Sequence, residues 1–261
     1  MSHRVVGVIG ASGGVGTSTL AVALALRATP AVGAVTCVDL VLQGGGLDVT
    51  ACVEHLPGLR WPDLAGARGR LDGADLLAAL PAEGPVRVLA AGSRGDWQAE
   101  GDGRVQGDGW VQGDRGLPGT GAGVPPDAVV VDCVAALSTV CSLTVLDLGT
   151  SSRWASLCTD VVLVSGSSAR QLADAGACAS ALRRAGGPAV SLVLRSARRE
   201  VVAPEEVAAH LDLPLAAVLR DDARAVADAD RGLAPGVRSG GAASSTADRV
   251  LRDCGLLGVP A

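Results

Sequence analysis

Residues 4–24 read RVVGVIGASGGVGTSTLAVAL, and this stretch decides the fold. Its first part, Arg4 to Gly10, is rich in β-branched side chains and predicts a buried β-strand. The glycine-rich segment GASGGVG follows at residues 10–16, and the Ala- and Leu-rich run after it has the period of a helix. A glycine loop between a strand and a helix N-terminus presents backbone N–H groups, and the helix dipole favours an anion there. We therefore expect a phosphate-binding loop at this junction.

The same apolar, β-branched pattern recurs along the chain and alternates with helical periodicity. We expect further strands at 34–40, 86–91, 142–149, 160–165, 189–195 and 214–219, and helices at 127–140, 169–185, 205–211, 222–231 and 244–256. Alternating strands and helices are typical of a parallel sheet with helices on both faces. The sequence therefore predicts an α/β fold with a doubly wound, mostly parallel sheet of about seven strands.

Residues 92–126 interrupt this alternation. Three degenerate copies of a six-residue unit that begins with Gly-Asp occupy residues 101–118. Three short copies are too few to stack as a solenoid, and a segment of this composition buries little apolar area. The length of 261 residues suits one large α/β domain. We therefore expect a single domain over residues 1–261 with a flexible surface insertion at 92–126.

The composition excludes several classes of function. All 22 basic residues are arginine, and the chain contains no lysine, tyrosine or phenylalanine. Chemistry that needs a lysine side chain is therefore excluded. A net charge of −5 argues against broad attraction to nucleic acid, so specific nucleic-acid binding is not expected. The seven cysteines are scattered without metal-ligand spacing, and we interpret them as reduced, small core residues.

Both ends of the chain bear on its location. The N-terminus lacks a basic region followed by an apolar signal segment, because residues 5–9 already form a strand, so we expect a cytoplasmic protein. Residues 247–261 carry two arginines balanced by two aspartates before a short apolar tail. This pattern predicts a final helix that packs on the sheet and argues against an autonomous membrane anchor.

The glycine loop has one interpretation as a dinucleotide site. Gly10, Gly14 and Gly16 satisfy the GxxxGxG pattern of short-chain dehydrogenases, and Asp39 closes the second strand where an acid binds ribose. Those enzymes move the alcohol proton with a Tyr-x-x-x-Lys pair, and this chain has neither residue type. A Rossmann-type dinucleotide-binding module without dehydrogenase activity stays open as an alternative.

The other interpretation aligns residues 12–19, SGGVGTST, with the deviant Walker A loop KGGVGKTT, so the chain resembles the MinD/ParA family of P-loop ATPases. The resemblance implies that ATP or ADP with Mg²⁺ is bound by Gly13, Gly14, Val15, Gly16, Thr17, Ser18 and Thr19. Ser18 takes the place of the hydroxyl that coordinates Mg²⁺. Ser12 and Thr17 replace two lysines, of which one reaches across the dimer and the other neutralises phosphate charge. Losing both should cost several kcal/mol of transition-state stabilisation, so we expect weak or absent hydrolysis and assign no catalytic residue.

The resemblance continues into the segment after the second strand. Asp39 and Asp48 keep the spacing of the family's switch segment. Val41 stands where the family has an acid that helps to position the attacking water. The resemblance therefore implies that this acid is absent in addition to the two lysines.

Two later strands also match. Residues 144–147, TVLD, match the Walker B strand, whose acid supports Mg²⁺, so Ser18 and Asp147 are the implied magnesium residues. Arg195 follows its strand where the family often has an asparagine that contacts adenine. Selectivity for adenine is therefore not implied.

Two short motifs point to one branch of this family. GGGLD at 44–48 and PGLRWPDL at 57–64 resemble the actinobacterial septum-site-determining (Ssd) and CpaE (TadZ)-like branch. The resemblance implies spatial regulation of the septum or of Tad/Flp pilus and secretion machinery, with protein partners from those machineries. It is compatible with a homodimer and with recruitment to a pole, the septum or the inner membrane face.

Two questions stay open on partners. An ATPase switch in which a partner's arginine replaces the missing charge is an alternative to a protein without turnover. Trp61 is the best candidate for a partner contact among the tryptophans, although core packing is the simpler explanation for each of them.

Overall fold

The structure is a computed structural model, and it describes residues 3–42, 46–92, 124–196 and 202–258. Residues 93–123 of the expected insertion lie outside the described residues, so its flexibility stays a prediction. The same holds for residues 44 and 45 of the GGGLD motif.

The described residues build an eight-stranded sheet in the order β3-β4-β2-β5-β1-β6-β7-β8. The strands are β1 (Arg4–Gly10), β2 (Val35–Asp39), β3 (Ala82–Glu83), β4 (Val86–Leu89), β5 (Leu143–Asp147), β6 (Asp160–Ser165), β7 (Ala189–Ser196) and β8 (Leu215–Arg220). Seven of them run parallel, and β3 pairs antiparallel with β4 at one edge. The predicted fold class is therefore confirmed. The two-residue β3 was missed, because it is too short to show a period.

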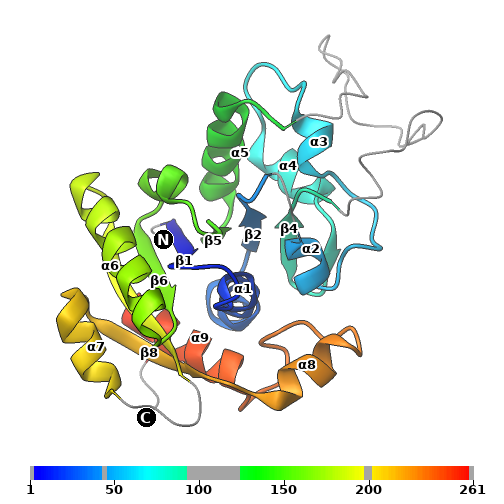
Figure 1. Cartoon of the computed structure of the whole chain (residues 1–261). Helices are drawn as coiled ribbons and strands as arrows, with labels where there is room; N and C mark the ends of the chain where they lie inside the picture. The colour runs from blue at the N-terminus through cyan, green and yellow to red at the C-terminus, as the bar shows by residue number, and fades with distance from the viewer. Residues whose placement is uncertain (1–2, 43–45, 93–123, 197–201, 259–261) are drawn as a thin grey trace.

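Helices cover both faces of this sheet (Figure 1). They are α1 (Thr17–Val32), α2 (Leu47–Thr50), α3 (Trp61–Leu64), α4 (Gly73–Ala79), α5 (Asp127–Val140), α6 (Ala169–Arg184), α7 (Pro204–Leu211), α8 (Ala223–Ala229) and α9 (Ala242–Asp253), with a 3-10 helix, η2, at Ser152–Leu157. One core cluster lies under α3 to α7, and the other lies under α1, α2 and α9. Alternate residues of β1 divide between the two, since Val5 and Ile9 join the first cluster, and Val6 and Val8 join the second.

The central strands are apolar along their whole length because both of their faces are covered. β2 and β5 are buried at every residue, and β1 at every residue after Arg4. Because β1, β2 and β5 run parallel, their carboxyl ends lie at one edge of the sheet, where the chain changes to polar residues. This edge carries the candidate site.

Trp61 belongs to the core. Its side chain is fully buried, and its indole N–H donates a 2.6 Å hydrogen bond to the carbonyl of Asp39. The hypothesis that Trp61 contacts a partner is wrong, and the alternative of core packing is confirmed. The contact instead anchors α3 to the end of β2.

The final helix α9 packs on the sheet beside α1. Ala247, Val250 and Leu251 are buried in the second core cluster, and Asp248 pairs with Arg27 of α1 at 2.7 Å. Among the described residues, no helix combines the length and the apolar character that a bilayer span requires.

Candidate functional site

The glycine loop is tied to the sheet at its start. The N–H of Gly10 donates to the carbonyl of Gly149 at 2.7 Å, and the N–H of Ala11 donates to the carbonyl of Val164 at 2.8 Å. These bonds connect the end of β1 to the residues that follow β5 and to the end of β6. The loop is thus held at the carboxyl edge of the central strands.

Two glycines of the loop have conformations that other residues rarely adopt. Gly14 has φ 75° and Gly16 has φ 100°, both in the left-handed region. A Cβ on Gly13 or Gly14 would meet no atom within 4 Å, so the space beside this part of the loop is open. An open, glycine-lined backbone allows a ligand to approach the amides closely.

Helix α1 begins directly after the loop with its N–H groups available to an anion. Its N-cap is Gly16, which has no side chain to accept from the first amides, and its first turn contains no acidic residue. The helix is 16 residues long, so its dipole is fully developed. This end of α1 favours a negative ligand.

The hydroxyl residues of the first turn point in three directions. The hydroxyl of Ser18 lies close enough to the carboxylate of Asp147, at the end of β5, to lower the pKa of that carboxyl. The hydroxyl of Thr17 lies against Gly10, since a Cβ built on Gly10 would overlap it. Thr19 lines a separate cavity beside α1. The structure therefore places Ser18 near Asp147, and their role in holding magnesium stays a prediction.

Three buried carboxyl groups gather behind the loop. Asp39 and Asp147 are register partners on the adjacent strands β2 and β5, and Asp48 lies in α2. Each of the three is 1% exposed. The N–H of Val41 donates to Asp39 at 2.8 Å, and the N–H of Val49 donates to Asp48 at 2.9 Å. The predicted switch residues thus lie beside the Walker B-like acid.

Burial changes how these acids ionise. Burial, together with the charges of Asp147 and Asp48, raises the pKa of Asp39 from 3.8 to about 7, although the N–H groups of Val41 and Leu47 oppose the shift. Burial also raises the pKa of Asp147, against the hydrogen bonds from Ser18 and Gly149. Asp39 therefore changes charge near neutral pH.

The donor set fits a magnesium ion that is held mainly by a ligand and by water. Ser18 and Asp147 offer a hydroxyl and a carboxylate in contact with each other. The Oδ2 atom of Asp48 is buried without a hydrogen-bond partner among the described residues, so it is an acceptor that a donor such as water would satisfy. In the described ranges no three His, Cys, Asp or Glu side chains form a metal cluster. Mg²⁺ keeps several waters and uses few protein ligands, so a hydroxyl and a carboxylate are donors of the kind it takes.

Val41 occupies the place of the acid that the resemblance associates with hydrolysis. Its side chain is 39% exposed, and it lies against Gly149, since a Cβ on that glycine would come within 2.5 Å of Val41 Cγ2. An apolar side chain in this place can neither orient nor deprotonate a water molecule.

The sequence singled out Arg195 at the family's adenine-contact position, but its contact with the glycine loop was not predicted. Its Nη1 donates to the carbonyl of Gly14 at 2.7 Å, and its Nε donates to Asp221 at 2.9 Å. Arg195 is the next-to-last residue of β7 and lies 181 residues from Gly14 in sequence, so no local pattern connects the two. Its place at the carboxyl end of a predicted parallel strand was the available signal.

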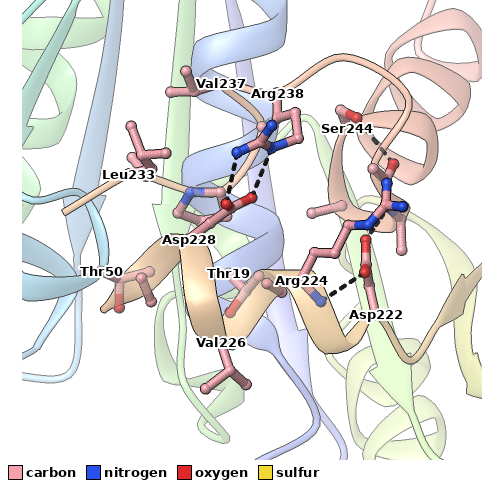
Figure 2. A pocket seen from close by; sticks show the side chains of 18 of the residues that line it. Thr19, Thr50, Asp222, Arg224, Val226, Asp228, Leu233, Val237, Arg238 and Ser244 are labelled. Atoms are coloured by element: carbon pink, nitrogen blue, oxygen red, sulfur yellow. Dashed lines mark hydrogen bonds and ion pairs between the residues drawn. The ribbon is translucent and has the colours of Figure 1, made fainter. Parts of the chain in front are cut away.

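A cavity of about 750 Å³ lies beside the start of α1 (Figure 2). α8 and the segment between α8 and α9 form much of its wall, and Thr19 and Thr50 contribute from α1 and α2. Figure 2 shows Asp228 and Arg238 facing each other, joined by two hydrogen bonds of 3.0 and 2.8 Å. The sequence analysis did not identify this cavity.

Comparison with known proteins gives partial matches in sequence. No protein-family model matches the chain. The uncharacterized proteins MT3760 and Rv3660c of two Mycobacterium tuberculosis strains are 47% identical over 91 residues. This match covers 35% of the chain and spans a quarter of the length of each relative.

Solved structures match over almost the whole chain. MinD in the MinC:MinD cell division complex of Aquifex aeolicus has a TM-score of 0.73 with 13% identity, covering 99% of this chain and 98% of that one. A ParA family ATPase of Chlorobium tepidum has a TM-score of 0.71 with 17% identity, covering 94% and 96%. MinD of Pyrococcus horikoshii, complexed with Mg-ADP, has a TM-score of 0.62 with 16% identity, covering 96% and 95%. The chain therefore has the P-loop fold of the MinD and ParA ATPases.

Proposed function

We propose that this chain is a CpaE/Ssd-like spatial regulator that binds a nucleotide with weak or absent hydrolysis. One observation carries the proposal. The glycine loop has the backbone conformation of a phosphate-binding loop, but uncharged residues stand where the resemblance places the charged residues needed for hydrolysis. Gly14 and Gly16 hold the left-handed loop conformation, and Ser18 contacts Asp147. Ser12, Thr17 and Val41 stand where the resemblance places two lysines and an acid.

In this proposal residues 13–19 bind the phosphates of ATP or ADP through backbone N–H groups and the N-terminus of α1. Ser18 and Asp147 would hold Mg²⁺, which neutralises phosphate charge when bound. Asp39 and Asp48, in the switch segment, would respond to the ligand through their contacts with Asp147 and with α2. Without the lysines, little positive charge is positioned to stabilise a transition state.

The regulatory role rests on the branch-specific motifs at 44–48 and 57–64. Proteins of the same fold include MinD in a complex with MinC. By analogy, we propose that this chain recruits protein partners of the division or Tad/Flp pilus machinery. We also propose that it is cytoplasmic and reaches a pole, the septum or the inner membrane face through those partners.

Nucleotide binding and turnover test the biochemical half of the proposal. Calorimetry with Mg-ATP and Mg-ADP should give measurable affinity, and phosphate release should stay near the background. A Ser12→Lys/Thr17→Lys double variant restores both amines and should bind Mg-ATP more tightly than the natural chain. Wild-type turnover well above the background would contradict the loss of catalysis, and absence of binding would contradict the nucleotide site.

Imaging tests the regulatory half. A fluorescent fusion expressed in a rod-shaped actinobacterium should concentrate at a pole or at the septum. A fusion that carries Gly16→Val, which disrupts the loop, is the matched control and should lose this pattern if the nucleotide directs placement. A uniform distribution of the wild-type fusion would count against spatial regulation.

A further inference from the structure

The arginine at the end of β7 provides positive charge at a loop that has none of its own. Among residues 3–42, 46–92, 124–196 and 202–258, Arg195 is the arginine whose side chain hydrogen-bonds the glycine loop. The bond joins Nη1 to the carbonyl of Gly14 at 2.7 Å. Gly14 lies in the loop segment beside the open space described above. The guanidinium of Arg195 therefore lies next to the part of the loop where an anion would bind.

The sheet explains why β7 reaches the loop. β6 separates β7 from β1, and the carboxyl ends of all three parallel strands lie at the same edge. Arg195 is the register partner of Leu219 on β8, and Leu219 Cδ2 lies 3.5 Å from where a Cβ on Gly16 would be. The ends of β7 and β8 thus both border the loop. A long side chain from β7 is needed to cross the width of β6.

The contacts of Arg195 suit an anion-binding role. A guanidinium has five N–H donors, and the bonds to Gly14 and Asp221 use two of them. The side chain is 41% exposed, so it is accessible to a ligand. Asp221, which is 49% exposed, holds the guanidinium beside the loop but also competes with an incoming anion for it.

We propose that Arg195 binds the phosphate oxygens of the nucleotide and replaces, from β7, the cations that the loop lacks at Ser12 and Thr17. The inference rests on the proposed nucleotide function and deepens it. An arginine binds phosphate through a planar fork, so recognition centres on the polyphosphate. The site then accepts compounds with a di- or triphosphate group, and the base contributes less than the phosphates.

Calorimetry with Mg-ATP and with sodium tripolyphosphate tests this assignment. Arg195→Gln should lower the affinity for both ligands about tenfold or more, which corresponds to the loss of one charge-assisted hydrogen bond. Arg195→Lys keeps the charge and should recover part of the affinity. Arg220→Gln is the matched control, because it removes the same charge from the adjacent end of β8 and should change either affinity less than about twofold.

A second variant covers the case in which Arg195→Gln does not fold, as judged by circular dichroism. Asp221→Asn removes the competing carboxylate and should tighten tripolyphosphate binding about threefold, with a steeper decrease in affinity as salt rises. Wild-type affinity that persists in Arg195→Gln, or an Asp221→Asn affinity at or below the wild-type value, would overturn the inference and leave the nucleotide site intact. A wild-type chain that binds neither ligand would overturn the proposed function as well.

Discussion

Asp39 is a buried carboxyl group whose charge depends on its neighbours at the end of β5 and in α2. Its pKa is raised to about 7, so the folded chain keeps a proton that the unfolded chain loses near pH 3.8. The stabilisation that this proton provides is complete below pH 3.8 and is lost as the pH rises through about 7. The free energy of unfolding should therefore fall between these values.

We expect Asp39→Asn to remove this pH dependence. The asparagine carbonyl can still accept from the N–H of Val41, and it carries no charge at any pH. The unfolding free energy of the variant relative to wild type, measured by urea unfolding, should be on the order of 2–3 kcal/mol higher at pH 8 than at pH 5. Asp75→Asn, at an exposed position of α4, is the control and should show no such difference. An equal effect of Asp39→Asn at both pH values would contradict the prediction.

Gly16 is the residue of the loop at which the backbone itself limits substitution. Its φ of 100° is unfavourable for any side chain, while the nearest atom to a Cβ there is at an ordinary contact distance of 3.5 Å. Gly16→Ala should therefore destabilise the fold by about 1–2 kcal/mol through backbone strain alone. Gly13→Ala, at a position with open space around it, should change the unfolding free energy by less than about 0.5 kcal/mol. Equal unfolding midpoints of the two variants would argue against the left-handed conformation at Gly16.

At the scale of elements, a buried arginine organises the connection between α2 and α3. Arg60 is 9% exposed, and its guanidinium donates to the carbonyls of Val53 at 3.1 Å, Leu56 at 3.2 Å and Gly58 at 3.1 Å. These three acceptors belong to a segment without regular structure. The guanidinium therefore takes the place of the backbone bonds that a helix or strand would provide.

Replacing Arg60 should loosen this whole connection. Arg60→Met keeps the apolar stem and leaves the three carbonyls without their donor, so we expect a loss of about 2–3 kcal/mol in unfolding free energy. Faster amide exchange over residues 53–60 should accompany it. Arg68→Met, at an exposed position after α3, is the control and should be nearly neutral. If both variants are equally stable, the arginine does not organise the segment.

At the scale of the whole molecule, ligand binding should raise the unfolding temperature. A ligand that binds only the folded chain adds about 2.7 kcal/mol at a hundred times its dissociation constant. Mg-ATP and Mg-ADP should therefore give a clear thermal shift, and NAD or NADP should give none. A shift with a dinucleotide and none with Mg-ATP would favour the Rossmann-type alternative over the proposed P-loop function.

Most of the architecture could be predicted because it depends on local patterns. All seven parallel strands were predicted within three residues of their observed ends, since each is a short β-branched run between helical segments. α5 was predicted with its observed bounds, Asp127–Val140. The four-residue helices α2 and α3 were not predicted, because four residues are too few to show a helical period, and the seven-residue α4 was also missed.

The candidate site was predictable only in part. The loop follows from local sequence, while Asp39 and Asp147 were assigned through the family resemblance at the ends of predicted strands. The family resemblance implied Ser18 and Asp147 as magnesium residues, which stays a prediction, and the two lie near each other in the structure. The pKa of Asp39 is raised by burial and by the charges of Asp147 and Asp48, which depend on how the whole chain packs, so the shift was not predictable.

The sequence by itself determined the parallel α/β sheet and the glycine loop, because both depend on neighbouring residues and their periodicity. The tertiary structure alone decided which distant side chains reach that loop. Arg195 contacts Gly14 and pairs with Asp221 because β7 and β8 follow β6 in the sheet, and their carboxyl ends share its edge. Strand order is a property of the whole packed chain, so the charge at a loop without lysines could be located only in three dimensions.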